Sequence, residues 1–251
     1  LGLPASWDPL GESVSDVGSA RLARDDYLAC LDEIEAQGLD ANVSVKLTQL
    51  GLALDRELAI EAMRLIAGRA AEIGTSVTID MEDSPYTDAT LDINELVQKE
   101  FGNVGVAVQS YLYRTGADVS RIAPLGGHIR LCRGAYAEPE SIAMTRKEHV
   151  DASFATLTRQ LMDQSDAKPA IASHDDRLID LTRTLVAGRE APFEFQMLYG
   201  IRTQLQEELV RQGHPLRIYI PYGSEWYPYL TRRLAERPAN TLFFMRALVG
   251  K

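Results

Sequence analysis

The chain has 251 residues, of which 45% are hydrophobic, so it can form either two small domains or one large α/β domain with a substantial core. A formal net charge of −10 argues against binding to nucleic acid, whose phosphates require a basic protein surface. Neither a signal peptide nor an apolar run of about 18 residues is visible, which favours a cytoplasmic protein and leaves open a peripheral contact with the inner membrane.

Short strand-like runs alternate with longer helical stretches along the chain. One apolar helical face contains Tyr27, Leu31 and Ile34 and closes near Gly38. Further helical faces span residues 59–73 and 201–209 and end at glycines. Strands that alternate with helices predict βαβ units and a parallel sheet. The strand-like runs are residues 43–48, 76–82, 104–109, 128–133, 170–174, 193–198 and 217–222.

An eighth strand is expected at the start of the chain, around "SWDPLGES". Pro4, Trp7 and Pro9 are unfavourable for a central strand, so this element is the weakest of the series. Eight strand–helix units in about 250 residues match the size of a (β/α)₈ barrel of the α/β class. Because no linker or low-complexity segment interrupts the series, we predict a single domain over residues 1–251.

The strand-like runs carry polar side chains on one face. Val43 and Val45, for example, alternate with Ser44 and Lys46, and the apolar face is expected to pack on helices. A half-solvated antiparallel sheet, or an internal salt-bridge network without a ligand, would give the same pattern. The long helical connections favour a parallel barrel with a polar ligand at its C-terminal rim. Its interior would contain Lys46, Asp80, Gln109, Arg130, His174, Gln196 and Tyr219.

Several common signatures are absent. The sequence contains no G-x-G-x-x-G, G-x-x-x-x-G-K-[ST], H-E-x-x-H or G-x-S-x-G motif, which argues against a Rossmann nucleotide site, a zinc protease and an α/β-hydrolase. Two cysteines and four scattered histidines predict neither a disulfide framework nor a metal site, and they favour a reducing compartment.

The combination of "VSVKLTQLG", "IDMED", "RLCRGAY", "EFQMLYG" and "RIYIPYG…YLTRRLAERPAN" resembles the proline dehydrogenases, from about residue 11 to the C-terminus. This resemblance implies a distorted (β/α)₈ barrel whose last helix lies over the barrel mouth. It also implies FAD at the C-terminal rim, and oxidation of L-proline to 1-pyrroline-5-carboxylate with electrons passed to a quinone. No aldehyde dehydrogenase half follows, so a monofunctional bacterial member is expected.

The resemblance also implies site residues, motif by motif. The substrate residues are Lys46, Asp80, Tyr136, Leu198, Tyr219, Arg232, Arg233 and Glu236. The flavin residues are Met81, Gln109, Arg130, Leu131, Arg133, Gly134, Ala135, Ser173, His174 and Gln196. Lys46, Asp80, Arg130 and Tyr219 are predicted to be catalytic. Arg133 stands where the family usually has lysine, and Ser173 where it usually has threonine, so altered flavin contacts are expected rather than lost binding.

The chemistry of these residues suits an amino-acid substrate. Two guanidinium groups, Arg232 and Arg233, can bind a carboxylate with charge-assisted hydrogen bonds, and Glu236 lies one helical turn further on to orient them. Without a ligand, the same residues would form an ordinary surface salt bridge. Arg130 can stabilise an anionic reduced flavin, or it can serve only as a partner for Asp80 or Glu194.

Other interpretations of the site residues stay open at this stage. Lys46 and Asp80 occupy matching positions on neighbouring strands and can form an ion pair, but Lys46 could instead act as the Schiff-base nucleophile of a lyase. Tyr136 and Tyr219 could be core aromatics, and His174 a hydrogen-bonded barrel histidine. A barrel that binds a metabolite without catalysis is a third alternative.

Overall fold

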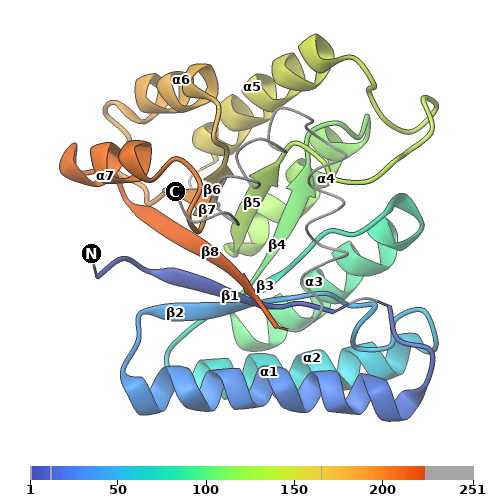
Figure 1. Ribbon diagram of the computed structural model, residues 1–251. Helices are drawn as coiled ribbons and strands as arrows, with labels where there is room; N and C mark the ends of the chain where they lie inside the picture. Colours follow the sequence, from blue (N-terminus) through green and yellow to red (C-terminus); the bar gives the residue numbers. More distant parts are fainter. Residues whose placement is uncertain (1, 12, 165, 224–251) are drawn as a thin grey trace, which may run out of the picture.

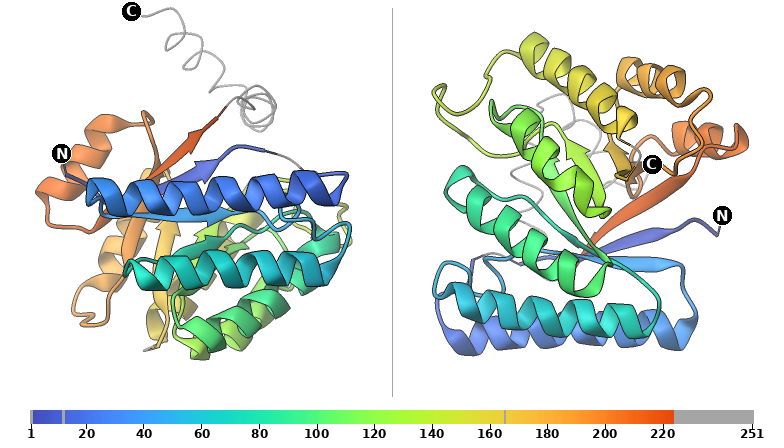
Figure 2. Two further views of the ribbon diagram at one scale, coloured as in Figure 1. Left: turned by 90° about the horizontal axis from the view of Figure 1, so that it is seen from below. Right: turned by 180° about the vertical axis from the view of Figure 1, so that it is seen from behind.

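Eight parallel strands close into a barrel in chain order, and helices surround it (Figures 1 and 2). The computed structural model describes residues 2–11, 13–164 and 166–223. The strands are β1 (Ala5–Pro9), β2 (Ala41–Val45), β3 (Val77–Ile79), β4 (Val104–Gln109), β5 (His128–Cys132), β6 (Lys168–Ala172), β7 (Glu194–Leu198) and β8 (Leu216–Tyr222). The predicted α/β barrel is thereby confirmed. The predicted helix over the barrel mouth falls on residues 224–251, outside the described residues, and the single domain stays a prediction.

Seven α-helices and two short 3₁₀ helices connect the described strands. They are α1 (Val17–Gln37), α2 (Arg56–Glu72), η1 (Ser84–Tyr86), α3 (Thr87–Phe101), α4 (Thr115–Ile122), η2 (Ala123–Leu125), α5 (Lys147–Asp163), α6 (Asp176–Val186) and α7 (Thr203–Arg211). Figure 1 places α1 and α2 side by side along one flank of the barrel, with α5, α6 and α7 on the opposite flank.

Local sequence signals set the ends of the helices. Asp16 caps α1 by accepting a hydrogen bond from the Ser19 amide at 2.9 Å, and Asp55 does the same for the Glu57 amide at the start of α2. Helix α1 ends at Gly38, whose φ of 61° lies in the left-handed region where glycine is favoured. The predicted apolar face of this helix, including Tyr27 and Leu31, is buried against the barrel.

The first strand forms despite its prolines, because they stand at or beyond its two ends. Pro4 precedes β1, and its carbonyl accepts the Ile218 amide of β8 at 2.8 Å. Pro9 is the last residue of the strand, where a missing N–H costs little. Trp7 faces outward and packs edge-on against Tyr222 with ring centroids 6.0 Å apart. The strand ends at Pro9, short of the predicted limit at residue 13.

Two strands are shorter than their sequence pattern suggests. Strand β2 ends at Val45 rather than at residue 48, and β3 ends at Ile79 rather than at residue 82. Side chains replace strand partners beyond these points, because the Lys46 amide donates to the Tyr27 hydroxyl and the Thr48 amide donates to Glu82. The remaining predicted strand limits differ from the observed ones by up to two residues.

The two faces of the strands differ as the alternation predicts. Outward-facing Val43, Val45, Val77 and Ile79 are completely buried beneath the helices. Inward-facing side chains are polar or small, as in the Ser44–Thr78–Gly105 row, whose members pair across β2, β3 and β4. All eight pairings are parallel, so the alternative of an antiparallel sheet is wrong.

A neutral polar cluster fills the amino-terminal end of the barrel interior. Here the Thr78 hydroxyl lies 2.7 Å from Nε2 of His128, and Asn42 Nδ2 lies 3.1 Å from the Ser76 hydroxyl. Gly105 makes room for the imidazole, because a Cβ at this position would overlap the backbone and ring of His128. Burial, together with the cations Arg130, Arg217 and Lys168, lowers the pKa of His128 to about 3, so the ring is neutral.

Candidate active site

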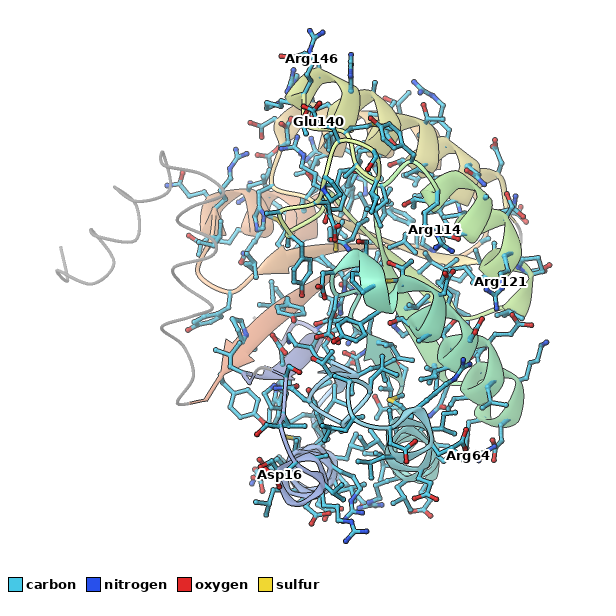
Figure 3. All side chains as sticks on the ribbon, turned by 90° about the vertical axis from the view of Figure 1, so that its right-hand side faces the viewer. Asp16, Arg64, Arg114, Arg121, Glu140 and Arg146 are labelled. Atoms are coloured by element: carbon cyan, nitrogen blue, oxygen red, sulfur yellow. The ribbon has the colours of Figure 1, made fainter. Side chains whose placement is uncertain are left out.

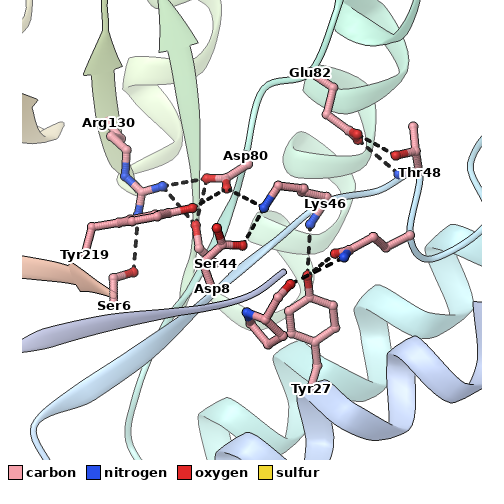
Figure 4. A network of polar contacts seen from close by, with 12 residues as sticks. Ser6, Asp8, Tyr27, Ser44, Lys46, Thr48, Asp80, Glu82, Arg130 and Tyr219 are labelled. Atoms are coloured by element: carbon pink, nitrogen blue, oxygen red, sulfur yellow. Dashed lines mark hydrogen bonds and ion pairs between the residues drawn. The ribbon is translucent and has the colours of Figure 1, made fainter. Parts of the chain in front are cut away.

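Arg130 lies at the centre of a buried charge layer above this cluster. Strand β5 directs its side chain into the barrel, where only 3% of the residue is exposed. Its guanidinium donates to Asp80 at 2.5 Å, to Ser44 Oγ at 2.9 Å and to Gln196 Oε1 at 2.5 Å, as Figure 4 shows in part. These partners belong to β2, to β7 and to the residue that follows β3, so one cation ties together side chains from distant parts of the barrel.

Lys46 lies between two carboxylates at the carboxyl ends of β1, β2 and β3. Its Nζ forms an ion pair with Asp8 and lies 3.5 Å from Asp80 Oδ2. Although burial lowers the pKa of Lys46, the attraction of Asp8 and Asp80 outweighs it and raises the pKa above that of a free amine. Lys46 is therefore an ammonium group, and the predicted pairing with Asp80 is present.

The two carboxylates of the layer differ in their affinity for protons. Burial raises the pKa of Asp8, which is completely inaccessible, and the attraction of Lys46 only partly offsets this. Burial acts on Asp80 in the same direction, but the cations Arg130 and Lys46 prevail and lower its pKa. Asp80 is thus held as a carboxylate, and Asp8 is the more basic of the two.

Two tyrosines border the charge layer. Tyr219 comes from β8, donates its hydroxyl to Asp80 Oδ2 at 2.9 Å, and lies beneath the Arg130 guanidinium at 4.9 Å from the ring centroid. Tyr27 comes from α1 and is buried beside Lys46, where burial raises the pKa of its phenol. The layer therefore contains two cations, two carboxylates and neutral phenols, and its formal charge is zero.

Side chains also join the loops at the carboxyl ends of the strands. The Glu82 carboxylate accepts hydrogen bonds from the amide and the hydroxyl of Thr48, which links the loops after β2 and β3 (Figure 4). Burial raises the pKa of Glu82. Gln109 at the end of β4 donates to the Glu82 carbonyl at 2.9 Å and accepts from the Ala135 amide at 3.1 Å. These bonds hold four neighbouring loops in register.

The loop after β5 begins with the predicted flavin residues. Arg133 forms ion pairs with Asp151 at 2.7 Å and with Asp175 at 2.9 Å, and its buried Nε has no hydrogen-bond partner among the described residues. Gly134 has a φ of 128°, and a Cβ there would overlap the Tyr111 ring. Only a glycine therefore fits between Arg133 and Ala135, and one N–H of the Arg133 guanidinium is left for a partner beyond the described residues.

The remaining predicted flavin residues lie along the same rim or just below it. His174 accepts the Leu198 amide at Nε2 over 3.1 Å, and the buried Ser173 hydroxyl accepts the Asp175 amide at 3.1 Å. Gln196 bridges Arg130 and Glu194. Met81 and Leu131 are buried in the apolar core. The predicted residues Tyr136 and Leu198 are half-buried at the carboxyl ends of β5 and β7.

The structure brings together Lys46, Asp80, Arg130, Gln196 and Tyr219, as the sequence pattern suggests. Arg130 pairs with Asp80, whereas Glu194 pairs with Arg217 at 3.0 Å, so the alternative of an Arg130–Glu194 pair is wrong. Arg232, Arg233 and Glu236 lie outside the described residues, and their roles stay predictions.

Sequence reasoning missed Asp8, although it is the ion-pair partner of Lys46. It also missed Ser6, which accepts a hydrogen bond from Arg130 at 3.3 Å. A signal was present, because Ser6 and Asp8 flank Trp7 with the same polar–apolar alternation as the other strands. The prolines on either side obscured it.

Comparison with known proteins identifies the family. Residues 1–246 match the model of a family described as proline dehydrogenase. Proline dehydrogenase 1 of Bacillus subtilis subsp. natto is 39% identical over 254 residues, which cover all of this chain and 83% of that protein. The proline dehydrogenase of Deinococcus radiodurans is 36% identical, with 99% of this chain and 82% of that protein covered. This chain belongs to the proline dehydrogenase family. The predictions of the family and of an enzyme of this kind are confirmed.

Two solved structures share the barrel. Proline utilization A from Bdellovibrio bacteriovorus, inactivated by N-propargylglycine, has a TM-score of 0.85 at 23% identity and shows the common fold. The match covers 93% of this chain and 30% of that one. A variant of proline utilization A from Bradyrhizobium japonicum has a TM-score of 0.83 at 25% identity, with 96% of this chain and 29% of that one covered. The chain thus spans less than a third of these two structures.

Two further properties concern the described residues alone. Within them, no group of three or more His, Cys, Asp and Glu residues is arranged to hold a metal ion. In the same part of the chain, every helix is too short or too polar to cross a bilayer.

Proposed function

We propose that this protein oxidises L-proline to 1-pyrroline-5-carboxylate, with FAD as its cofactor and a quinone as the electron acceptor. The observation that carries the proposal is the buried charge layer of Asp8, Lys46, Asp80 and Arg130 at the carboxyl end of the barrel. Enzymes built on this barrel have their active sites at that end. The family match over residues 1–246 supports proline as the substrate.

The rim residues fit a flavin dinucleotide. Arg133 and the backbone at Gly134 would hold its phosphate groups, Ala135 would lie beside them, and Ser173 and His174 would extend the contact along β6. Met81, Gln109, Leu131 and Gln196 would line the same ligand, with Arg130 beneath them. When bound, FAD supplies the acceptor for a hydride from the carbon next to the proline nitrogen. The buried Arg130 cation would stabilise negative charge that the cofactor gains on reduction.

Lys46 favours the neutral form of the substrate amine. Lys46 keeps its proton because Asp8 and Asp80 raise its pKa, so it cannot take the proton that the substrate nitrogen must lose. As a fixed cation, it instead disfavours a second positive charge beside it. Asp8 is the more basic carboxylate of the layer, but it is completely inaccessible, so its assigned role is to hold Lys46 as a cation.

The substrate is bound mainly through its carboxylate. In this proposal Arg232 and Arg233 hold the carboxylate as a pair, and Glu236 orients them. Tyr136, Leu198 and Tyr219 enclose the ring. Tyr219 also fixes Asp80 through its hydrogen bond. We place the reaction in the cytoplasm, with a peripheral contact at the inner membrane from which a quinone is reached.

Lys46 is assigned an electrostatic role, although it is the candidate nucleophile of a Schiff-base lyase. A nucleophilic amine must be neutral, and the two neighbouring carboxylates oppose this. Borohydride treatment in the presence of substrate should therefore leave Lys46 unmodified. A reduced covalent adduct on Lys46 would overturn the assignment in favour of the lyase.

The direct test is the absorbance spectrum of the purified protein with and without L-proline. The protein should be yellow or should bind added FAD, and L-proline should bleach the flavin absorbance in the absence of an acceptor. Added quinone should restore it. L-prolinamide, which lacks the carboxylate, is the matched control and should bleach it far more slowly. A protein that binds no FAD, or FAD that L-proline leaves oxidised, would contradict the proposal and would favour a non-catalytic binding barrel.

A further inference from the structure

The loop between β5 and α5, residues 133–146, is anchored near both of its ends. At its start, the Tyr111 amide donates to the Arg133 carbonyl at 2.9 Å, and the Ala135 amide donates to Gln109. At its far end, Ala143 pairs with Leu112 in an isolated antiparallel bridge. Tyr136 lies between these anchors, in the part of the loop that must span the rim of the barrel.

Glu138 fastens this middle part to a different element. One oxygen of its carboxylate accepts the Ser84 amide at 2.6 Å, and the other accepts the Ser84 hydroxyl at 2.6 Å. Ser84 is the first residue of η1, so its amide has no acceptor within the turn and the carboxylate supplies one. Both Ser84 and Glu138 are half-buried, which strengthens these bonds relative to those of exposed groups.

The bond between Glu138 and Ser84 joins two segments of the candidate site. Ser84 follows Asp80, Met81 and Glu82 in the same short segment after β3. Glu138 follows Tyr136 by two residues, and the Glu138 amide donates to the Tyr136 carbonyl at 3.1 Å in a tight turn. A displacement of Glu138 therefore moves the backbone of Tyr136. The carboxylate fixes the distance between the segment that contains Asp80 and the segment that contains Tyr136.

We propose that Glu138 is a positioning residue, which holds Tyr136 over the substrate site through Ser84. This inference rests on the proposed function, because the substrate contact of Tyr136 belongs to that proposal. Glu138 itself touches neither substrate nor cofactor in this account. Its replacement should raise the KM for proline more than it lowers kcat, since substrate enclosure is lost while the charge layer is intact.

The first test uses the protein without cofactor or substrate. Hydrogen exchange of the backbone amides of residues 136, 137, 138 and 140 should be about 10-fold faster in Glu138→Ala than in the unsubstituted protein. Glu140→Ala is the matched control. Glu140 lies in the same loop, is exposed at the periphery (Figure 3), and contacts only the Thr145 hydroxyl at 3.3 Å among the hydrogen bonds of the described residues. The control should leave exchange at residues 136–138 unchanged.

The second test uses steady-state kinetics with proline. Glu138→Ala should lower kcat/KM about 10- to 100-fold, mostly through KM, with unchanged flavin content. Glu138→Gln should restore most of the loss, because its amide can accept the Ser84 N–H and donate to the Ser84 hydroxyl. Ser84→Ala removes one of the two bonds and serves as a second variant if Glu138→Ala does not fold.

A double substitution separates positioning from a general effect on the fold. In a Tyr136→Ala background, replacement of Glu138 by alanine should cause little further loss, because the side chain that it positions is gone. Full additivity of the two losses, or a wild-type KM in Glu138→Ala, would overturn the inference. Both results require an unsubstituted protein that oxidises proline, so they leave the proposed function standing. A protein without that activity would contradict the proposed function instead, and faster exchange in Glu138→Ala would still establish the anchor.

Discussion

Asp8 sets the protonation of the charge layer, because it is the partner that Lys46 contacts most closely. Replacement by asparagine keeps the shape but leaves a buried ammonium whose nearest carboxylate is Asp80 at 3.5 Å. Breaking a buried ion pair in this way typically costs about 3–5 kcal/mol. We expect the free energy of unfolding of Asp8→Asn to fall by about this amount and the pKa of Lys46 to fall.

Urea denaturation measures the change in the free energy of unfolding, and Asp40→Asn is the matched control. Asp40 is exposed and lies 4.0 Å from Arg217, so its replacement should leave the stability nearly unchanged. Equal stability of the two variants would mean that the ion pair between Asp8 and Lys46 contributes nothing to the fold.

His128 should make the stability depend on pH. Its pKa is about 3 in the folded protein because of burial and the nearby cations, against about 6.5 in an unfolded chain. Below pH 6.5 the His128 imidazole binds a proton in the unfolded chain but not in the folded protein. The free energy of unfolding should therefore fall from pH 6.5 towards pH 3, by at most about 1.4 kcal/mol per pH unit.

His128→Gln is the comparison, since glutamine can keep a hydrogen bond to Thr78 and does not titrate. Denaturation curves at several pH values should show a shallower loss of stability in this variant below pH 6.5. Parallel profiles for the two proteins would show that another group causes the pH dependence.

The pair of adjacent arginines in "TRRLAE" gives a prediction from sequence alone, because these residues lie outside the described ones. If each arginine contributes about 1.5–3 kcal/mol through charge-assisted bonds to a carboxylate, Arg232→Met or Arg233→Met should lower kcat/KM for proline about 10- to 150-fold. Glu236→Gln should have a weaker effect. Kinetics with parallel flavin spectra test this prediction, and wild-type kcat/KM in both methionine variants would make them an ordinary surface pair.

At the scale of elements, two glycines should respond oppositely to replacement by alanine. Gly105 in β4 has no room for a Cβ because the His128 backbone and ring lie against it, so Gly105→Ala should lose about 1–3 kcal/mol of stability. In α2, a Cβ at Gly68 would lie at an ordinary 3.4 Å from the Phe101 ring. Gly68→Ala should gain up to about 1 kcal/mol from helix propensity. Thermal unfolding of both variants checks the signs, and a stable Gly105→Ala protein would refute the close approach.

The elements also define the limits of sequence reasoning. The alternation of apolar and polar residues located seven strands, because every strand of the barrel needs an apolar face against the helices. It failed at β1, since local rules for proline treat every strand position alike, whereas Pro9 stands at the strand end. It overextended β2 and β3 because Lys46, Thr48 and Glu82 continue the pattern while their backbone groups bond to side chains.

The site could be predicted as far as it follows from the alternation of side chains between the two faces of a strand. Inward polar residues such as Lys46 and Arg130 could be placed on one face before any contact was known. Their partners could not be predicted. Arg130 could have paired with Asp80 or with Glu194, and only the relative shift of the strands in the barrel selects Asp80. Asp8 and the bond between Glu138 and Ser84 depend on contacts across strands or loops that no local pattern encodes.

At the scale of the whole molecule, arginines bridge neighbouring helices around one flank of the barrel. Arg69 of α2 pairs with Asp32 and Glu35 of α1, and Arg121 of α4 pairs with Asp92 and Glu95 of α3. Figure 3 shows Arg64, Arg114 and Arg121 on this outer surface. Such exposed networks are screened by salt, so they contribute mainly at low ionic strength.

Arg69→Met should therefore lower Tm slightly in dilute buffer. The difference from the unsubstituted protein should shrink in 1 M sodium chloride, where the Debye length is about 3 Å. Differential scanning calorimetry at the two salt concentrations measures this difference in Tm. A difference that persists unchanged at high salt would indicate that the packing of the Arg69 side chain, rather than its charge, matters.

The closure of the barrel has a consequence for synthesis on the ribosome. The charge layer spans the junction of the first and last strands, since Asp8 comes from β1 and Tyr219 from β8. Tyr219 follows its partner Asp80 by 139 residues. At about 5–20 residues per second, Tyr219 is added on the order of 7–28 s after Asp80. Throughout this interval the carboxylate and its cations stay hydrated, and the layer loses its water only when β8 completes the ring.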